Sequence, residues 1–83
     1  MRIMICGDAA SGKSHFAKKL GAILGIPVIH LDQEMMRIGR EHRNQITAYI
    51  ETIVQQPDWI IDGNAFGKDK EARIRSADHI FIF

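Results

Sequence analysis

The sequence contains little cysteine and little proline, and it has no long hydrophobic segment. One cysteine and two prolines occur among the 83 residues, which excludes an internal disulfide. Because Cys6 lies in an apolar stretch, we expect a buried, inert thiol and a cytoplasmic location. No window approaches the roughly 18 apolar residues of a membrane span, and Met1 to Gly7 is too short for a signal peptide. We therefore predict no membrane attachment.

The sequence also lacks an excess of charge of either sign. Eleven Lys and Arg residues against ten Asp and Glu residues give a formal net charge of +1. Proteins that bind nucleic acid electrostatically are usually strongly basic, so direct DNA binding is not expected. The composition, 46% hydrophobic and 25% charged, indicates one globular domain. So small a domain has a thin core, and we expect it to gain stability from ligand, from further chain or from self-association.

The order of apolar segments predicts an α/β fold. Strands are expected at Arg2–Cys6, Pro27–Leu31, Trp59–Asp62 and His79–Phe83. Between them, apolar spacing predicts helices over Gly12–Leu24 and from Ile46 to Val54, a short helix or loop over Glu34–Arg43, and a short helix around Lys70–Arg75. This alternation implies a parallel sheet with right-handed crossovers.

The segment that follows the first predicted strand carries the clearest motif. It reads Gly7-Asp8-Ala9-Ala10-Ser11-Gly12-Lys13-Ser14 and matches the phosphate-binding pattern GxxxxGK[ST]. Because it also opens a predicted helix, backbone N–H groups there converge on a phosphate chain. We assign Lys13 to the β- and γ-phosphates, the Ser14 hydroxyl to Mg²⁺, and the His15 backbone N–H to the same site.

Two aspartates at predicted strand ends complete the candidate site. Asp62 ends the apolar segment Trp59–Asp62, and we interpret it as the carboxylate that helps to hold Mg²⁺. The alternative is a turn-forming residue before Gly63. Asp32 follows the second predicted strand, where it either contacts the substrate, as a base, or caps the next helix.

Other polar and sulfur-containing residues are weaker candidates. Arg37, Arg40 and Arg43 are spaced to share one helical face, which suits either an anionic acceptor or a solvated surface. Arg73 and Arg75 are interpreted as partly exposed, with phosphate contact as the alternative. His30 is interpreted as a strand residue with its partners inside the fold. Met35, Met36 and Trp59 are assigned to packing, with a substrate pocket as the alternative for the methionines.

Nearly the whole chain resembles a known family. The combination of GxxxxGKS, His30-Leu31-Asp32 and Trp59-Ile60-Ile61-Asp62-Gly63-Asn64 is similar to small adenylate-kinase-like P-loop proteins of the DNA topology modulation family. The resemblance implies a three-layer fold with strand order 2-3-1-4-5 and chemistry like that of nucleoside monophosphate and shikimate kinases. It also implies that residues 1–83 form one nucleotide-binding core that stops before the lid and the fifth strand.

Three functional hypotheses follow. The first is a phosphotransferase core that binds ATP and Mg²⁺, with a small-molecule acceptor near Asp32 and with Lys13, Asp62 and Asp32 as catalytic residues. The second is a nucleotide-binding module or fragment without turnover. The third is a protein that affects DNA topology, which the absence of a helix-turn-helix or zinc pattern disfavours.

Overall fold

The chain was analysed as a computed structural model that describes residues 1–7, 12–63 and 67–83. Eight elements follow one another along the chain: β1 (Arg2–Cys6), α1 (Lys13–Leu24), β2 (Val28–His30), α2 (Leu31–Ile38), α3 (Arg43–Val54), β3 (Trp59–Asp62), α4 (Gly67–Ser76) and β4 (His79–Ile82). Among these described helices, none is long and apolar enough to cross a membrane.

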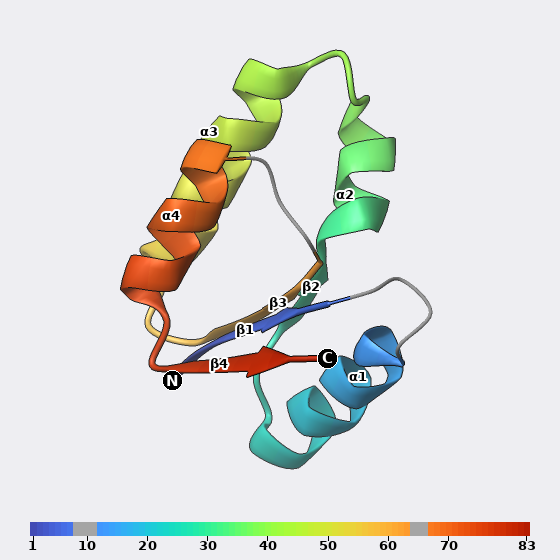
Figure 1. Ribbon diagram of the computed structural model, residues 1–83, viewed down its shortest axis with the longest axis vertical. Helices are drawn as coiled ribbons and strands as arrows, with labels where there is room; N and C mark the ends of the chain where they lie inside the picture. The colour runs from blue at the N-terminus through green and yellow to red at the C-terminus, as the bar shows by residue number, and fades with distance from the viewer. Residues whose placement is uncertain (8–11, 64–66) are drawn as a thin grey trace.

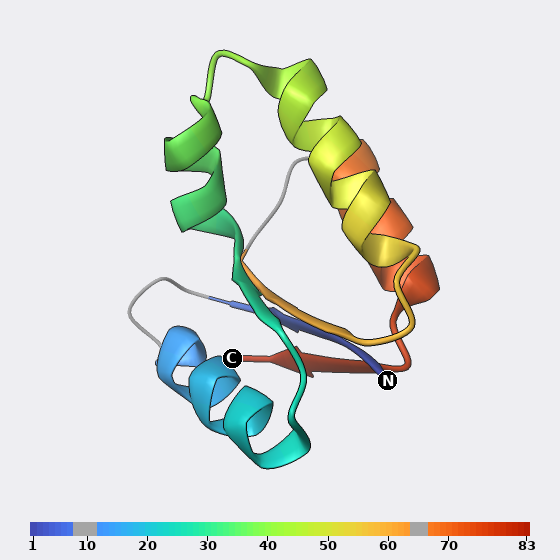
Figure 2. The same cartoon turned by 180° about the vertical axis from the view of Figure 1, so that it is seen from behind.

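The strands form one parallel sheet in the order β2-β3-β1-β4. The predicted parallel α/β architecture and the order of these strands are therefore confirmed. Helix α1 covers one face of the sheet, and α2, α3 and α4 lie on the other (Figure 1), an arrangement that is also clear from behind (Figure 2). Because the strands are parallel, all their carboxyl ends lie at one edge of the sheet.

Alternation along the strands divides the core into two clusters. Ile3, Ile5 and Ile60 pack with Ala17 on the α1 side. Residues that point to the opposite face pack with α2 and α3: Met4, Cys6, Trp59 and Ile61 with Leu31, Met35, Ile46, Ile50 and Val54. The predicted burial of Cys6 and the predicted packing roles of Met35 and Trp59 are confirmed, whereas Met36 is 71% exposed and does not pack in the core.

The second strand is shorter than the sequence predicts. Leu31 was expected in a strand Pro27–Leu31, but β2 is limited to Val28–His30 and Leu31 is the first residue of α2. Its side chain is fully buried, and an apolar residue at a strand-to-helix junction contributes equally to either pattern. Helix α2 accordingly begins three residues before the expected segment Glu34–Arg43.

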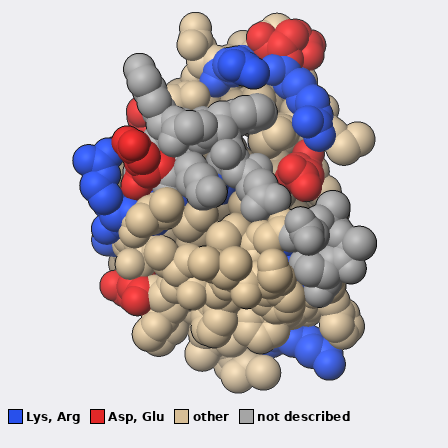
Figure 3. All heavy atoms as spheres, viewed as in Figure 1, with Lys and Arg blue, Asp and Glu red and all other residues tan. Residues whose placement is uncertain are grey.

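Strand β4 is one of the two edge strands of the described sheet, and β2 is the other. The side chains of Ile80, Phe81, Ile82 and Phe83 are all more than one third exposed. The space-filling view shows an uncharged surface over this part of the molecule, with charged side chains around it (Figure 3). On the α1 side, the ring of Phe16 contacts those of Phe81 and Phe83, with centroids 5.3 and 5.2 Å apart.

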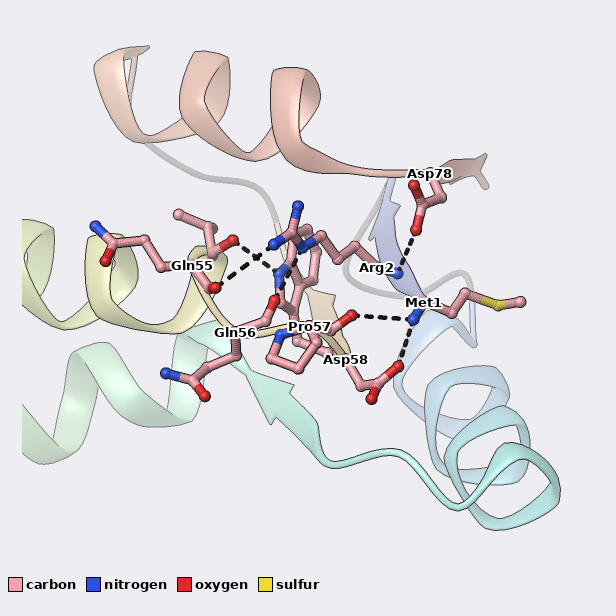
Figure 4. A network of polar contacts seen from close by, with 9 residues as sticks. Met1, Arg2, Gln55, Gln56, Pro57, Asp58 and Asp78 are labelled. Carbon is pink, nitrogen blue, oxygen red and sulfur yellow. Dashed lines mark hydrogen bonds and ion pairs between the residues drawn. The ribbon is translucent and has the colours of Figure 1, made fainter.

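The amino ends of the strands are tied together by the first two residues (Figure 4). The Met1 ammonium group donates to the Pro57 carbonyl at 3.0 Å and pairs with the Asp58 carboxylate. The Arg2 backbone N–H donates to Asp78 at 2.9 Å, and its Nε donates to the Gln56 carbonyl at 2.9 Å. This network is at the edge opposite the motif residues, so it supports the sheet without contributing to the candidate site.

Candidate functional site

Three adjacent strands bring the candidate residues to the carboxyl edge of the sheet. In the parallel register Asp62 of β3 lies beside Ile5 of β1 and, on its other side, beside His30 of β2. Strand β1 leads directly into the motif at Gly7. Open α/β sheets bind ligands at this edge, so the topology places Asp62 next to the strand that feeds the phosphate-binding motif.

The start of α1 provides the cationic part of the site. Lys13 is the first residue of the helix and is only 5% exposed. Gly12 precedes it with φ 82° and, as the N-cap residue, offers no side chain to cap the helix, whose first turn has no acidic residue. The positive end of the helix dipole favours an anion at this position.

The space around Gly12 is compatible with a ligand. A Cβ atom built at Gly12 would have no atom within 4 Å among the described residues. Ser14 and His15 follow in the first turn of α1 and are exposed. The four residues Asp8, Ala9, Ala10 and Ser11, which the sequence also assigns to phosphate binding, lie outside the described residues.

Asp62 is held in a buried polar pair. Asp62 is 3% exposed. Its Oδ2 contacts Nδ1 of His30, whose side chain is 16% exposed. Gly63 follows with φ 127°, and a Cβ there would lie 2.8 Å from Cβ of Leu31. Asp62 is thus a buried strand residue, and its pairing with His30 is a feature that sequence reasoning missed, because the two residues are 32 positions apart.

The sequence suggested that Asp32 lies at the end of a strand, but the structure places it in a helix. It is exposed and lies in the first turn of α2, where a carboxylate interacts favourably with the helix dipole. Helix α2 starts directly after β2, so Asp32 is at the same sheet edge as Asp62. The N-cap residue of α2 is His30, so the alternative that Asp32 caps this helix is wrong. An acceptor contact stays a prediction.

The proposed basic face of three arginines does not form. Helix α2 ends at Ile38, Gly39 turns the chain with φ 104°, and Arg43 begins α3, so Arg37, Arg40 and Arg43 are not on one helix. Arg73 was expected to be partly exposed, but it is fully buried, while Arg75 is exposed. Helix α4 extends over Gly67–Ser76, longer than predicted, and packs against α3 and β1, which explains the burial.

Arg37 is instead part of a small cluster between α2 and α3. Its Nε donates to Oε2 of Glu34 at 2.7 Å, and its guanidinium lies 5.6 Å from the centre of the Tyr49 ring. The hydrogen bond and the charge of Glu34 raise the pKa of Arg37. Partial burial, together with the charge of Glu34, raises the pKa of Tyr49. Because Glu34 already neutralises Arg37, an anionic acceptor would compete with an existing ion pair.

The donor atoms suit magnesium as a companion of phosphate. The described residues contain no group of three or more His, Cys, Asp or Glu side chains arranged to hold a metal ion. Magnesium, however, is usually bound through one or two protein oxygen ligands together with water and substrate phosphates. The Ser14 hydroxyl and the Asp62 carboxylate are oxygen donors of that kind, so the site fits magnesium bound with a nucleotide.

Comparison with known families agrees with this geometry. The profile of the AAA_33 family, described as an AAA domain, matches residues 3–65. The chain belongs to this family. The matched part of this AAA domain contains all but the first residue of β1, the phosphate-binding motif, α1 and Asp62. A search of curated proteins found no match.

Comparison with solved structures confirms the fold of the AAA domain. It is similar to shikimate kinase from Aquifex aeolicus vf5, with a TM-score of 0.75 and 24% sequence identity. The match covers 100% of this chain and 60% of that kinase, so the chain spans well under two thirds of its structural neighbour. The AAA domain thus has a P-loop kinase-like fold, while membership of the DNA topology modulation family stays a prediction.

Proposed function

We propose that the chain is the nucleotide-binding core of a small-molecule phosphotransferase, with ATP bound along Gly7–Ser14. The observation that carries this proposal is the buried Lys13 at the start of α1, at the same sheet edge as the buried Asp62 on the strand beside β1. Charges withdrawn from water act more strongly on a ligand than exposed ones. Lys13 thereby supplies a cation for phosphate, and Asp62 supplies a carboxylate for the metal that accompanies phosphate, both at the carboxyl edge of the sheet.

Each site residue has a distinct task in this proposal. The Lys13 ammonium binds the β- and γ-phosphates, and the N-terminal amides of α1 orient the phosphate chain. Ser14 and Asp62 hold magnesium, which neutralises phosphate charge when it is bound. Catalysis in this proposal consists mainly of positioning and charge stabilisation.

The acceptor is proposed to be a small molecule near Asp32. Its carboxylate is exposed in the first turn of α2, where it is accessible to a hydroxyl group and able to accept a proton from it. The likeness in fold to a protein described as a shikimate kinase supports an acceptor of this size class. Asp32→Asn should then lower the rate of phosphoryl transfer while ATP affinity stays within about twofold, because general base catalysis contributes to the rate.

The second candidate is a nucleotide-binding module without turnover. The chain spans 60% of the kinase that it resembles in fold, and the candidate site supplies residues for nucleotide phosphates and magnesium. Nucleotide binding can therefore be proposed for residues 1–83 independently of phosphoryl transfer. Steady-state ATP consumption, with and without hydroxyl-bearing acceptors, separates the two candidates.

Nucleotide binding itself is tested by removing the Lys13 ammonium. Hydrogen bonds to charged groups contribute about 1.5–3 kcal/mol, so Lys13→Ala should weaken ATP binding in the presence of Mg²⁺ by roughly 10- to 150-fold. Isothermal titration calorimetry measures the affinity. Lys18→Ala, which removes an exposed lysine from the same helix, is the matched control and should bind like the parent; equal affinity for the Lys13 variant would refute the site.

A further inference from the structure

The pair formed by His30 and Asp62 is a part-buried polar contact at the carboxyl edge of the sheet. The two residues end adjacent strands and are register partners. Their side chains are 16% and 5% exposed, and Nδ1 of His30 contacts Oδ2 of Asp62. Buried polar groups of this kind persist because they satisfy one another.

This contact restricts the orientation of the Asp62 carboxylate. Rotation of a carboxylate about its terminal torsion has only broad preferences, so without a partner the plane of the group is poorly defined. A hydrogen bond at Oδ2 defines that plane. A carboxylate has two acceptor oxygens, so occupation of Oδ2 leaves Oδ1 as the oxygen for a second partner.

The chemistry of the pair also defines the tautomer of the imidazole. A carboxylate is an acceptor, so Nδ1 must carry the hydrogen that His30 donates. In metal sites, residues that hydrogen-bond to a metal-binding group orient it, and their loss typically lowers metal affinity 10- to 100-fold. His30 stands in that relation to Asp62, one strand further from the phosphate-binding motif.

We propose that His30 is a positioning residue, which donates from Nδ1 to Oδ2 of Asp62 and so directs Oδ1 toward the magnesium of the bound nucleotide. This inference rests on the proposed function, because it assigns a role in magnesium–ATP binding. The sequence indicated only that His30 is a strand residue with its hydrogen-bond partners inside the fold. The proposal adds that the partner is Asp62 and that the hydrogen bond orients its carboxylate.

The test compares ATP affinity with Mg²⁺ and with EDTA in three variants. His30→Leu removes the donor, and the gain in affinity on adding Mg²⁺ should fall about tenfold or more, while affinity in EDTA stays unchanged. His30→Asn should restore most of the gain, because its amide nitrogen is the same number of bonds from Cβ as Nδ1. His79→Leu, at an exposed histidine on β4, should match the parent.

The possible outcomes separate this inference from the proposed function. If the parent binds no ATP, or binds it equally with and without Mg²⁺, the magnesium role and the inference both fail. If the parent shows the Mg²⁺ gain and His30→Leu keeps it, the inference alone is overturned. Equal losses in His30→Leu and His30→Asn would likewise show that donation from Nδ1 is not the cause.

A spectroscopic measurement covers the case in which the leucine variant does not fold. Nitrogen-15 NMR of the parent should show a hydrogen on Nδ1 of His30, and Asp62→Asn should change that signature. An imidazole that carries its hydrogen on Nε2 alone in the parent would overturn the proposed donation.

Discussion

Gly7, where the phosphate-binding motif leaves β1, requires glycine for two separate reasons. Its φ is 137°, and a Cβ atom there would lie 2.8 Å from Cβ of Phe83. Gly25 also has a positive φ, of 67°, but has open space around it. Gly25→Ala should therefore cost about 1–2 kcal/mol from backbone strain alone, whereas Gly7→Ala should cost about 3 kcal/mol or more.

Urea unfolding of the two alanine variants measures this difference. The two substitutions add the same methyl group, so the excess loss in Gly7→Ala reports the contact with Phe83 together with the less favourable φ of Gly7. Equal losses would show that the chain end does not pack against the start of the motif.

Tyr49 offers a pH-dependent test of the cluster between α2 and α3. Burial and the charge of Glu34 raise its pKa above 10.0, so the folded protein keeps the phenol proton to higher pH than the unfolded chain does. The stability from this group is present below pH 10 and is lost as the pH rises through the folded-state pKa. Because Tyr49 is the only tyrosine, phenolate absorbance reports its titration directly.

The Glu34→Gln variant is the control for this titration. It removes the charge and keeps the size of the side chain, so the midpoint should move back toward that of free tyrosine while part of the shift from burial stays. An unchanged midpoint would contradict a contribution from Glu34.

At the scale of single residues, local sequence patterns indicate candidate site residues but not their tertiary contacts. Lys13 and Asp62 could be proposed as site residues because a glycine-rich loop and an apolar strand are patterns of neighbouring residues. The pairing of His30 with Asp62 depends on which strands become neighbours, and the burial of Arg73 depends on how α4 packs. Both features depend on tertiary structure. The His30–Asp62 pairing could still have been suspected, because both residues lie at or next to the ends of predicted parallel strands, whose carboxyl ends lie at one edge of the sheet.

At the scale of elements, Gly21 shows how packing reverses a helix preference. Glycine within a helix normally costs about 1 kcal/mol relative to alanine, so propensity alone predicts that Gly21→Ala stabilises α1. A Cβ at Gly21, however, would overlap Cγ2 of Val28 and lie 3.1 Å from the Ile26 carbonyl oxygen. Valine is stiff about χ1, so we expect Gly21→Ala to destabilise the fold by about 1–3 kcal/mol.

Two further variants isolate the cause. Ala22→Gly, at the next and exposed position, measures propensity in the same helix and should cost about 1 kcal/mol. Gly21→Ala combined with Val28→Ala should be less destabilised than the sum of the single variants, as chemical denaturation will show. Simple additivity would exclude an overlap between α1 and β2.

Elements were predicted well where a pattern repeats and poorly where one turn decides the boundary. The strands Arg2–Cys6 and Trp59–Asp62 are as expected, because each is an apolar segment followed by glycine. The start of α2 was misplaced because Leu31 is buried in the helix rather than in the strand. The prediction of an arginine face was wrong because a second helix boundary was missed: α2 ends before Gly39, which separates Arg37 from Arg43.

At the scale of the whole molecule, we expect the exposed side chains of β4 and the small core of the described residues to limit stability. A domain of about 80 residues buries little more than 60% of the surface of its unfolded chain, and exposed apolar edge strands favour association. Self-association through this edge stays a prediction from the sequence. The same thin core makes the domain sensitive to any ligand that binds only the folded state.

Magnesium–ATP should therefore raise the melting temperature strongly. A ligand at 100 times its Kd adds about 2.7 kcal/mol, and each kcal/mol shifts the Tm of a domain this small by roughly 4–8 °C, so a rise of about 10–20 °C is expected. Differential scanning calorimetry measures the shift. All samples have the same protein concentration, so that differences in self-association do not contribute to the shift. Lys18→Ala should show the full rise. Lys13→Ala should show about half of it or less, because the same ligand concentration is then at most about 10 times the weakened Kd. A parent whose Tm does not respond to saturating magnesium–ATP would contradict binding at the phosphate motif, since ligand that binds only the folded state must stabilise it.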